Sequence, residues 1–247
     1  MKILLIADIH SNLPALQAID ESFDACLFLG DLVDYCTDPV PCIDWVRRNA
    51  LHAVRGNHDH AVSQRIAPKV GSGYRRVAMA TRPVQWDRID HARMKFLARL
   101  PASQFATLDG ESFCLVHATP RDPMDEYLGA DAGGWRERLA GITSRYVCVG
   151  HTHLPFVLDL GGQYVINPGS VGQPRDGDPR AAYAVIENGR IELRRVPYDI
   201  DATLRQMQDC GVPEGTVEAT EAILRSGGRV TPDEIDRLMP APLAAPE

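Results

Sequence analysis

The stretch KILLIADIHSN, residues 2–12, contains the pattern that decides the fold of this chain. Its apolar run, Ile3 to Ala7, has the length of a buried strand and ends at Asp8 and His10. A membrane-spanning helix needs roughly 20 apolar residues, and the core of a signal peptide is also longer than this run. We therefore interpret the stretch as a buried strand of a cytoplasmic protein that does not associate with membranes.

Four more apolar runs end in the same kinds of polar residue. They are ACLFLGDLVD (25–34), LHAVRGNHDH (51–60), FCLVHATPRD (113–122) and RYVCVGHTHLP (145–155). Segments with helical spacing of apolar residues separate the first three runs, in PALQAIDES (14–22) and DPVPCIDWVRRNA (38–50). Strands that alternate with helices indicate an α/β layered domain.

The second half of the chain favours antiparallel strands. Asp109-Gly110 and Asn188-Gly189 each stand between two strand-like runs, which is typical of a tight hairpin turn. Residues 61–101 have helical spacing instead, and Pro83 is expected to break them into two helices. We predict one domain over residues 1–198, with a helical insertion at about 61–101. A C-terminal helical extension over residues 199–247 is expected to pack on or beside the core.

The composition fits a globular protein. With 247 residues, of which 45% are hydrophobic, the chain can bury a large core. The net charge of −7 provides no overall basic field that would attract nucleic acid. The six cysteines include no C-x-x-C pair, so a cysteine-based zinc site is not expected. We interpret them as small buried side chains in a reducing compartment.

Five strand ends carry side chains that can bind metal or transfer protons. These residues are Asp8, His10, Asp31, Asp34, Asn57, His58, Asp59, His117, His151 and His153. Ligand sites in open α/β sheets gather at the carboxyl ends of the strands, so we expect these side chains to meet. Carboxylates packed together repel one another unless a cation lies among them. Carboxylate, imidazole and amide ligands without thiolate suit manganese, iron, zinc or similar ions, and a metal pair can promote displacement at phosphorus.

The order of these motifs, with glycines before Asp31, Asn57 and His151, resembles that of the calcineurin-like metallophosphoesterases. The segment NPGSVGQPRDGDPRAAYAV, residues 167–185, is similar to a compact prokaryotic branch of phosphoesterases in that superfamily. The resemblance covers about residues 1–198. It implies an α/β fold of two packed mixed β-sheets flanked by helices, with a metal pair at the sheet edge. Manganese or iron is favoured for the two divalent ions per chain, with zinc, nickel or magnesium as alternatives.

The resemblance also implies a role for each motif residue. The first metal would be bound by Asp8, His10, Asp31 and His153, and Asp31 would bridge to the second. The second metal would be completed by Asn57, His117 and His151. His58 would bind no metal but would protonate the leaving oxygen, and Asp34 would orient it. General acid catalysis of this kind is typically worth about 10²–10⁴ in rate.

The substrate contacts leave several candidates open. In the protein serine/threonine phosphatases of this superfamily, a phosphate-binding arginine follows the second aspartate motif, where this chain has Tyr35. Arg121 is our preferred substitute because a guanidinium fork suits phosphate, and Arg55 and Arg175 are alternatives. Asn12 is a second candidate for substrate binding, although it can instead cap the following helix. Asp59 is expected either to anchor its loop from outside the metal site or simply to cap it.

We therefore predict metal-dependent hydrolysis of phosphoester bonds by a hydroxide that bridges two metals, with monoesters and diesters both open. A small-molecule substrate is favoured. The first alternative is a nuclease, whose basic groove would come from the arginines of the insertion, Arg65, Arg75, Arg76, Arg82, Arg88 and Arg93. Further alternatives are a non-catalytic metal-binding scaffold and a mononuclear hydrolase. The insertion is expected to roof the site, and the sequence does not decide the oligomeric state.

Overall fold

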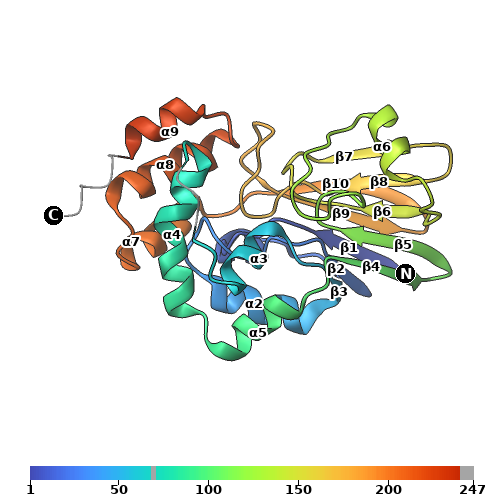
Figure 1. The fold of residues 1–247 in the computed structure, drawn as a ribbon, viewed down its shortest axis with the longest axis horizontal. Helices are drawn as coiled ribbons and strands as arrows, with labels where there is room; N and C mark the ends of the chain where they lie inside the picture. Colours follow the sequence, from blue (N-terminus) through green and yellow to red (C-terminus); the bar gives the residue numbers. More distant parts are fainter. Residues whose placement is uncertain (68–70, 240–247) are drawn as a thin grey trace.

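The strands of the protein form two mixed sheets that pack face to face (Figure 1). The computed structural model describes residues 1–67 and 71–239. The first sheet has the order β10-β9-β1-β2-β3 and the second has the order β4-β5-β6-β8-β7. The first contains β1 (Lys2–Ile6), β2 (Ala25–Phe28), β3 (Ala50–Ala53), β9 (Ala181–Glu187) and β10 (Arg190–Val196). The second contains β4 (Ser103–Leu108), β5 (Glu111–Val116), β6 (Tyr146–Cys148), β7 (Phe156–Asp159) and β8 (Tyr164–Asn167).

The alternation of side chains along β1 explains why this strand lies inside the layers. Leu4 and Ile6 join the core between the first sheet and its helices, whereas Leu5 joins the core between the two sheets. Leu115 and Ile166 of the second sheet face Leu5 in that central core. A strand buried on both faces needs a continuous apolar run, which is what residues 3–7 supply.

Helices cover the outer faces of both sheets. Leu16 of α1 (Leu13–Gln17) and Ile43 of α2 (Pro39–Asn49) pack against the first sheet. On the second sheet, Trp135 of α6 (Ala132–Arg138) packs against Val116 and Val165. This arrangement confirms the predicted α/β fold of two packed mixed sheets flanked by helices. In the described part of the chain, no helix is long and apolar enough to cross a membrane.

The two predicted hairpins are present. Strands β4 and β5 pair through the turn at Asp109 and Gly110, where φ is 54° and 79°. Strands β9 and β10 pair through Asn188 and Gly189, where φ is 51° and 78°. Two successive positive φ angles are the requirement of the type I′ hairpin turn. Strand β7 and helix α6 were not picked out by the sequence analysis.

The segment predicted as an insertion contains α3 (Asn57–Ser63), α4 (Tyr74–Arg88) and α5 (His91–Arg99), and its residues 68–70 lie outside the described range. The expected break at Pro83 is wrong, because Pro83 lies within α4. The helix ends at Arg88, and Asp90 caps the backbone N–H of Arg93 at the start of α5. Burial of Arg82 and Gln85 on either side of Pro83 holds the helix together despite the lost backbone hydrogen bond.

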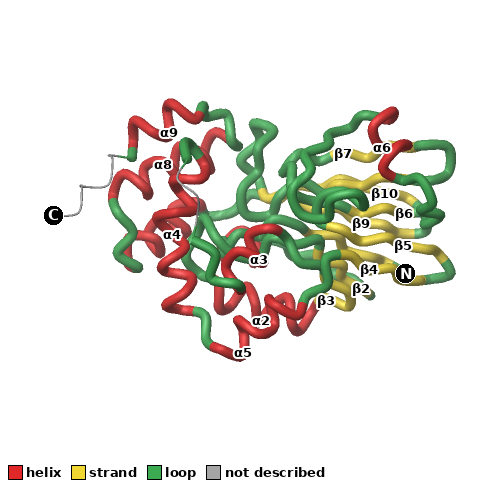
Figure 2. The backbone as a smooth tube through the Cα atoms, viewed as in Figure 1, coloured by secondary structure: helices red, strands yellow, loops and turns green. Residues whose placement is uncertain are grey.

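Within the described residues, three further helices follow β10. They are α7 (Ile200–Asp209), α8 (Glu214–Ser226) and α9 (Pro232–Leu238), and residues 240–247 lie outside the described range. Helix α8 contacts α4 and α7, and α9 contacts α4. These helices gather around α4 at one end of the strand layers (Figure 2). Arg76 of α4 forms an ion pair with Asp236 of α9, so the two segments are joined by charge as well as by apolar contacts.

Candidate metal centre

Loops that follow parallel strands bring the predicted ligands to one buried place. The loop after β1 carries Asp8 and His10, and the loop after β2 carries Asp31. The side chains form two groups in which the possible ligand atoms of each group lie within 4.8 Å of one another. One group is Asp8, His10, Asp31 and His153, and the other is Asp31, His117 and His151. Asp31 belongs to both, and Asn57 Oδ1 lies 3.3 Å from His117 Nε2.

Unusual backbone conformations turn these side chains inward. Non-glycine residues with positive φ in the loops after β1, β2 and β6 are Asp8, His10, Ser11, Asp31, Asp34, Tyr35, His151 and His153. A left-handed conformation of this kind costs on the order of 1 kcal/mol or more for a residue with a side chain. The concentration of such residues here shows that backbone strain is tolerated where several polar side chains must converge.

Three imidazoles are oriented by backbone carbonyl groups. The Nδ1 atoms of His10, His117 and His153 lie 2.9, 2.8 and 2.6 Å from the carbonyl oxygens of Val33, Leu29 and Gln173. A carbonyl only accepts hydrogen bonds, so each Nδ1 carries a proton, and in the neutral rings of His10 and His153 the Nε2 atom presents a lone pair to the centre. The Nε2 atoms of His10 and His153 lie 3.2 Å apart. Two lone pairs that face each other at this distance repel unless a cation lies near both.

Burial leaves other polar atoms of the centre without partners. Asp8 Oδ2 and both ring nitrogens of His151 are buried and make no hydrogen bond to the described residues. Burial lowers the pKa of His10 and of His151 to about 3, so both rings are neutral. Burial also raises the pKa of Asp8 to about 8. Unpartnered acceptors, neutral imidazoles and clustered carboxylates without thiolate are the donor set of a divalent metal site, so these residues fit such an ion.

His58 lies beside this centre in a chain of charged groups. Its Nδ1 lies 2.7 Å from Asp34 Oδ2, and Asp34 also accepts hydrogen bonds from the guanidinium of Arg82. Burial works against a charged imidazole, but the carboxylates of Asp31 and Asp34 raise the pKa of His58 above its ordinary value. Burial likewise opposes the charge of Asp34, yet the contacts with His58 and Arg82 lower its pKa.

Arg82 is the residue of this chain that sequence reasoning missed. It was counted only among the arginines of a possible nucleic-acid groove. In the structure its side chain is buried against Asp34, which lies 48 positions earlier. No local pattern around Arg82 signals this partner, although its place on the buried face of an amphipathic helix is a weak indication.

Asp59 connects two of the ligand-bearing loops. Its carboxylate accepts hydrogen bonds from the backbone N–H groups of Asp31 (2.9 Å), Leu32 (2.8 Å) and Gly56 (3.1 Å). The first two belong to the loop after β2 and the third to the loop after β3. Asp59 is therefore an anchor across loops as well as a cap of its own helix.

The two predicted substrate contacts lie in different surroundings from those expected. Asn12 is buried and its amide makes contacts inside the protein, which favours the alternative that it caps the following helix. Its Oδ1 caps Ala15 and accepts from Thr203, while its Nδ2 donates to the carbonyl of Gly172. Arg121 is exposed and forms an ion pair with Glu126, so its charge already has a partner.

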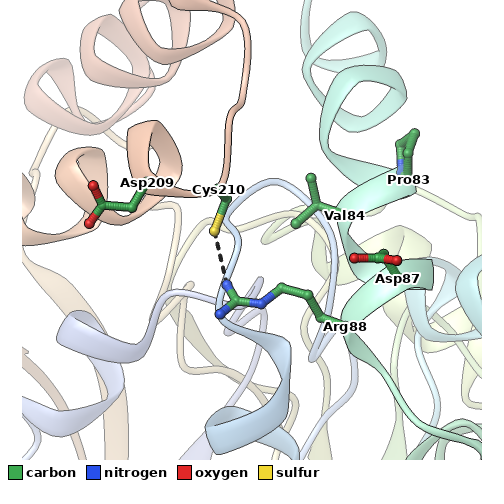
Figure 3. A pocket seen from close by; sticks show the side chains of 6 residues that line it. All are labelled: Pro83, Val84, Asp87, Arg88, Asp209 and Cys210. Carbon is green, nitrogen blue, oxygen red and sulfur yellow. Dashed lines mark hydrogen bonds between the residues drawn. The ribbon is translucent and has the colours of Figure 1, made fainter.

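Most of the insertion's arginines make contacts inside the protein. Four of the six are engaged in internal contacts: Arg76 with Asp236, Arg82 with Asp34, Arg88 with Thr37 and Cys210, and Arg93 with Asp44 and Asp90. A groove of about 480 Å³ lies beside α4 and is lined by Pro83, Val84, Asp87, Arg88, Asp209 and Cys210 (Figure 3). Its two carboxylates outnumber its single arginine, which disfavours binding of nucleic acid there.

The fold and the centre together define a class of protein. Two packed mixed sheets with buried aspartate and histidine groups after their strands are the architecture of a metallophosphoesterase, a hydrolase of phosphoester bonds. Residues 1–189 match the calcineurin-like phosphoesterase superfamily domain, and the chain belongs to that superfamily.

Individual relatives agree with this assignment. A metallophosphoesterase from Sphaerobacter thermophilus has 34% identity and a TM-score of 0.76, over 92% of this chain and 99% of that one. MJ0912, an uncharacterised protein of Methanocaldococcus jannaschii, is 32% identical over 86% of this chain and 94% of its own length. The phosphodiesterase YfcE of Escherichia coli K12 is 27% identical over 78% of this chain and 91% of its own length.

Proposed function

We propose that the protein hydrolyses small-molecule phosphoesters with two divalent metal ions and with His58 as the general acid. The ligands of the first ion would be Asp8, His10, Asp31 and His153. Asp31 would be shared with the second ion, which Asn57, His117 and His151 would complete. Manganese or iron is the preferred metal because the set combines carboxylates with imidazoles and contains no thiolate.

One observation carries this proposal. The Nε2 atoms of His10 and His153 lie 3.2 Å apart while both Nδ1 atoms face carbonyl oxygens. The carboxylate of Asp31 lies near this pair and 3.2 Å from His117 Nε2. Lone pairs of His10, Asp31 and His153, which come from three separate loops, therefore converge. Because the carboxylate of Asp31 belongs to both ligand groups, it supports a pair of ions rather than one.

When bound, the two ions would activate a water molecule as the nucleophile and offset the negative charge of the phosphoryl group. His58 would act on the opposite side of the reaction. Asp34 accepts from its Nδ1, which leaves Nε2 free to donate a proton to the departing oxygen. The leaving group would depart as an alcohol, and His58 would regain its proton from solvent.

The substrate is proposed to be small rather than a nucleic acid. Four of the six insertion arginines are engaged inside the protein, and the net charge of the chain is −7. The similarity to a protein named phosphodiesterase supports diesters as one class to test, beside monoesters.

We also propose the domain organisation and location that the sequence predicted. The catalytic domain would span residues 1–198, and helices α7, α8 and α9 would belong to an extension that packs on α4. A cytoplasmic location is supported by the six free cysteines, five of which are buried.

Hydrolysis of a chromogenic phosphate monoester and diester tests the proposed function. We expect the chelator-treated protein to be inactive and added Mn²⁺ to restore turnover of at least one substrate. Elemental analysis is expected to find two metal ions per chain. Absence of turnover with both sites loaded would favour a binding scaffold, and one ion per chain in the active protein would favour a mononuclear hydrolase.

A further inference from the structure

Arg175 lies in the loop after β8 and is surrounded by neutral groups. Its Nε and Nη2 atoms donate to Gln173 Oε1 at 3.2 and 2.7 Å, and Nη2 lies 3.5 Å from the hydroxyl of Tyr35. The guanidinium carbon lies 4.2 Å from the ring centre of Tyr74 and 5.8 Å from that of Tyr35. Contacts of this kind hold the plane of a guanidinium in place.

Arg175 forms no direct ion pair with a carboxylate of the described residues, although it lies close enough to the buried Asp8 to act on the pKa of that carboxyl. Arg121, Arg180 and Arg195, by contrast, each pair with an aspartate or glutamate. Arg175 is half-buried, and the hydroxyl of Tyr127 is a further neutral hydrogen-bond partner of its guanidinium. A partly desolvated cation that forms no ion pair is unfavourable unless an anion binds nearby.

The surroundings of Arg175 connect it to the candidate metal centre. Gln173, which accepts from Arg175, also accepts a hydrogen bond from His153 Nδ1 through its backbone carbonyl. The ring of Tyr35 lies 4.7 Å from that of His10 and 4.9 Å from that of His58. Arg175 is thus separated by one side chain from a proposed metal ligand and from the proposed acid.

We propose that Arg175 binds a non-bridging oxygen of the substrate's phosphoryl group, an inference that rests on the proposed function. Its guanidinium carries five N–H donors in one plane, a geometry that suits phosphate oxygens. Arg121 and Arg55 fit this role less well, because Arg121 pairs with Glu126 and Arg55 donates to the carbonyl of Ala98. The serine/threonine phosphatases of this superfamily have a phosphate-binding arginine where this chain has Tyr35. In this chain, the positive charge would come instead from Arg175 in the loop after β8.

This assignment also gives the C-terminal helices a part in substrate binding. Tyr74, which packs on Arg175, stands at the start of α4, and its hydroxyl donates to the carbonyl of Gly228 after α8. The loop of Arg175 is held there as well, because the N–H of Gly177 donates to the carbonyl of Gly227. The extension therefore fixes both partners of the cation–π contact.

Binding of inorganic phosphate to the Mn²⁺-loaded protein tests the proposal without requiring turnover. Calorimetry would compare wild type, Arg175→Gln and Arg175→Lys, with Arg180→Gln as the control because Arg180 belongs to the same loop but pairs with Asp178. We expect the Kd for phosphate to rise about 10- to 100-fold in Arg175→Gln, with the lysine variant between it and wild type. The KM for p-nitrophenyl phosphate should rise more than kcat falls, and metal content and Tm should stay unchanged.

Three results would overturn the assignment of Arg175. One is a phosphate affinity in Arg175→Gln equal to that of an active wild type. A second is a loss of phosphate affinity in Arg121→Gln but not in the Arg175 variants. A third is that both Arg175 variants bind less metal or have a lower Tm, and that this change alone explains their weaker phosphate binding. If metal-loaded wild type neither binds phosphate nor hydrolyses any ester, the proposed function itself is wrong instead.

Discussion

Arg82 of helix α4 forms a buried ion pair with Asp34, the same carboxylate that contacts His58. The Nε atom of Arg82 lies 3.2 and 3.1 Å from the two carboxylate oxygens. Asp34 therefore stands between an imidazole and a guanidinium that come from different elements. Helix α4, part of the segment expected to roof the site, thus supplies the outer end of the chain of charged groups that orients the proposed acid.

Replacement of Arg82 by alanine is expected to affect both stability and rate. It leaves Asp34 buried without one of its two cationic partners, so the free energy of unfolding should fall by about 3 kcal/mol. His58 should be less well oriented, and kcat should fall about 10-fold with little change in KM. Urea unfolding and steady-state kinetics check both effects. Arg75→Ala on the exposed face of the same helix is the control, and equal effects of the two variants would contradict this role.

His58 and Asp31 are expected to fail in different ways when replaced. His58→Ala should retain nearly all its metal but lose about 10²–10⁴ in kcat, most for substrates with poor leaving groups. Asp31→Ala should lose metal, because its carboxylate belongs to both ligand groups. Elemental analysis with kinetics on two leaving groups distinguishes them. Equal loss of metal from both variants would show that the proposed division of roles is wrong.

Removal of the Asp59 carboxylate is expected to loosen two loops at once. Asp59→Ala leaves the backbone N–H groups of Asp31, Leu32 and Gly56 without their acceptor. We expect the free energy of unfolding to fall by about 2–4 kcal/mol, together with weaker metal binding. Asp59→Asn keeps one carbonyl oxygen and should lie between alanine and wild type. Denaturant titration with and without metal measures the effect, and an alanine variant that binds metal normally would contradict it.

Gly172 is expected to accept no side chain. A Cβ atom there would lie 1.9 Å from the carbonyl oxygen of Ile9, in the loop that carries Asp8 and His10. Gly172→Ala should therefore displace that loop, lowering Tm by several degrees and reducing metal content. Gly129→Ala is the matched control, because its Cβ would meet nothing within 4 Å. Similar Tm values for the two variants would disagree with the close packing of Gly172.

Glu126 is expected to stabilise the protein only above mildly acidic pH. Hydrogen bonds from Arg138 and Thr119 lower its pKa from 4.5 to about 2. A carboxylate whose pKa falls on folding contributes stability above pH 4.5 and loses that contribution as the pH falls toward about 2. Wild type should exceed Glu126→Gln by about 1 kcal/mol at pH 7, with the difference shrinking below pH 4.5. Urea unfolding across this range measures it, and a difference independent of pH would rule out the ionised carboxylate as its source.

The local signals in the sequence were sufficient for the layers of the fold. Apolar runs of strand length, turn pairs such as Asp109-Gly110 and polar residues after each run depend on neighbours in the chain. Pro83 shows where such signals fail. Its local effect on a helix was outweighed by the burial of Arg82 and Gln85, which the surrounding fold decides.

Roles that require a partner far away in the chain could not be read locally. From the sequence alone, the polar amide of Asn12 is a candidate substrate contact. In the folded protein this amide accepts a hydrogen bond from Thr203 and donates one to the carbonyl of Gly172. Arg121 is the preferred phosphate contact in the sequence because a guanidinium fork suits phosphate. Its partner Glu126 is only five positions away, but the sequence does not show that the loop between them brings the two charges together.

The sequence by itself determined the α/β layers and the residue types that meet at the strand ends, because both follow from short-range periodicity and from strand direction. Only the tertiary structure decided which charges have partners. Arg82 is paired with Asp34 and Arg175 is held by Tyr74, and each contact depends on where helix α4 packs. Such packing joins residues that are 48 or more positions apart, so no local pattern specifies it.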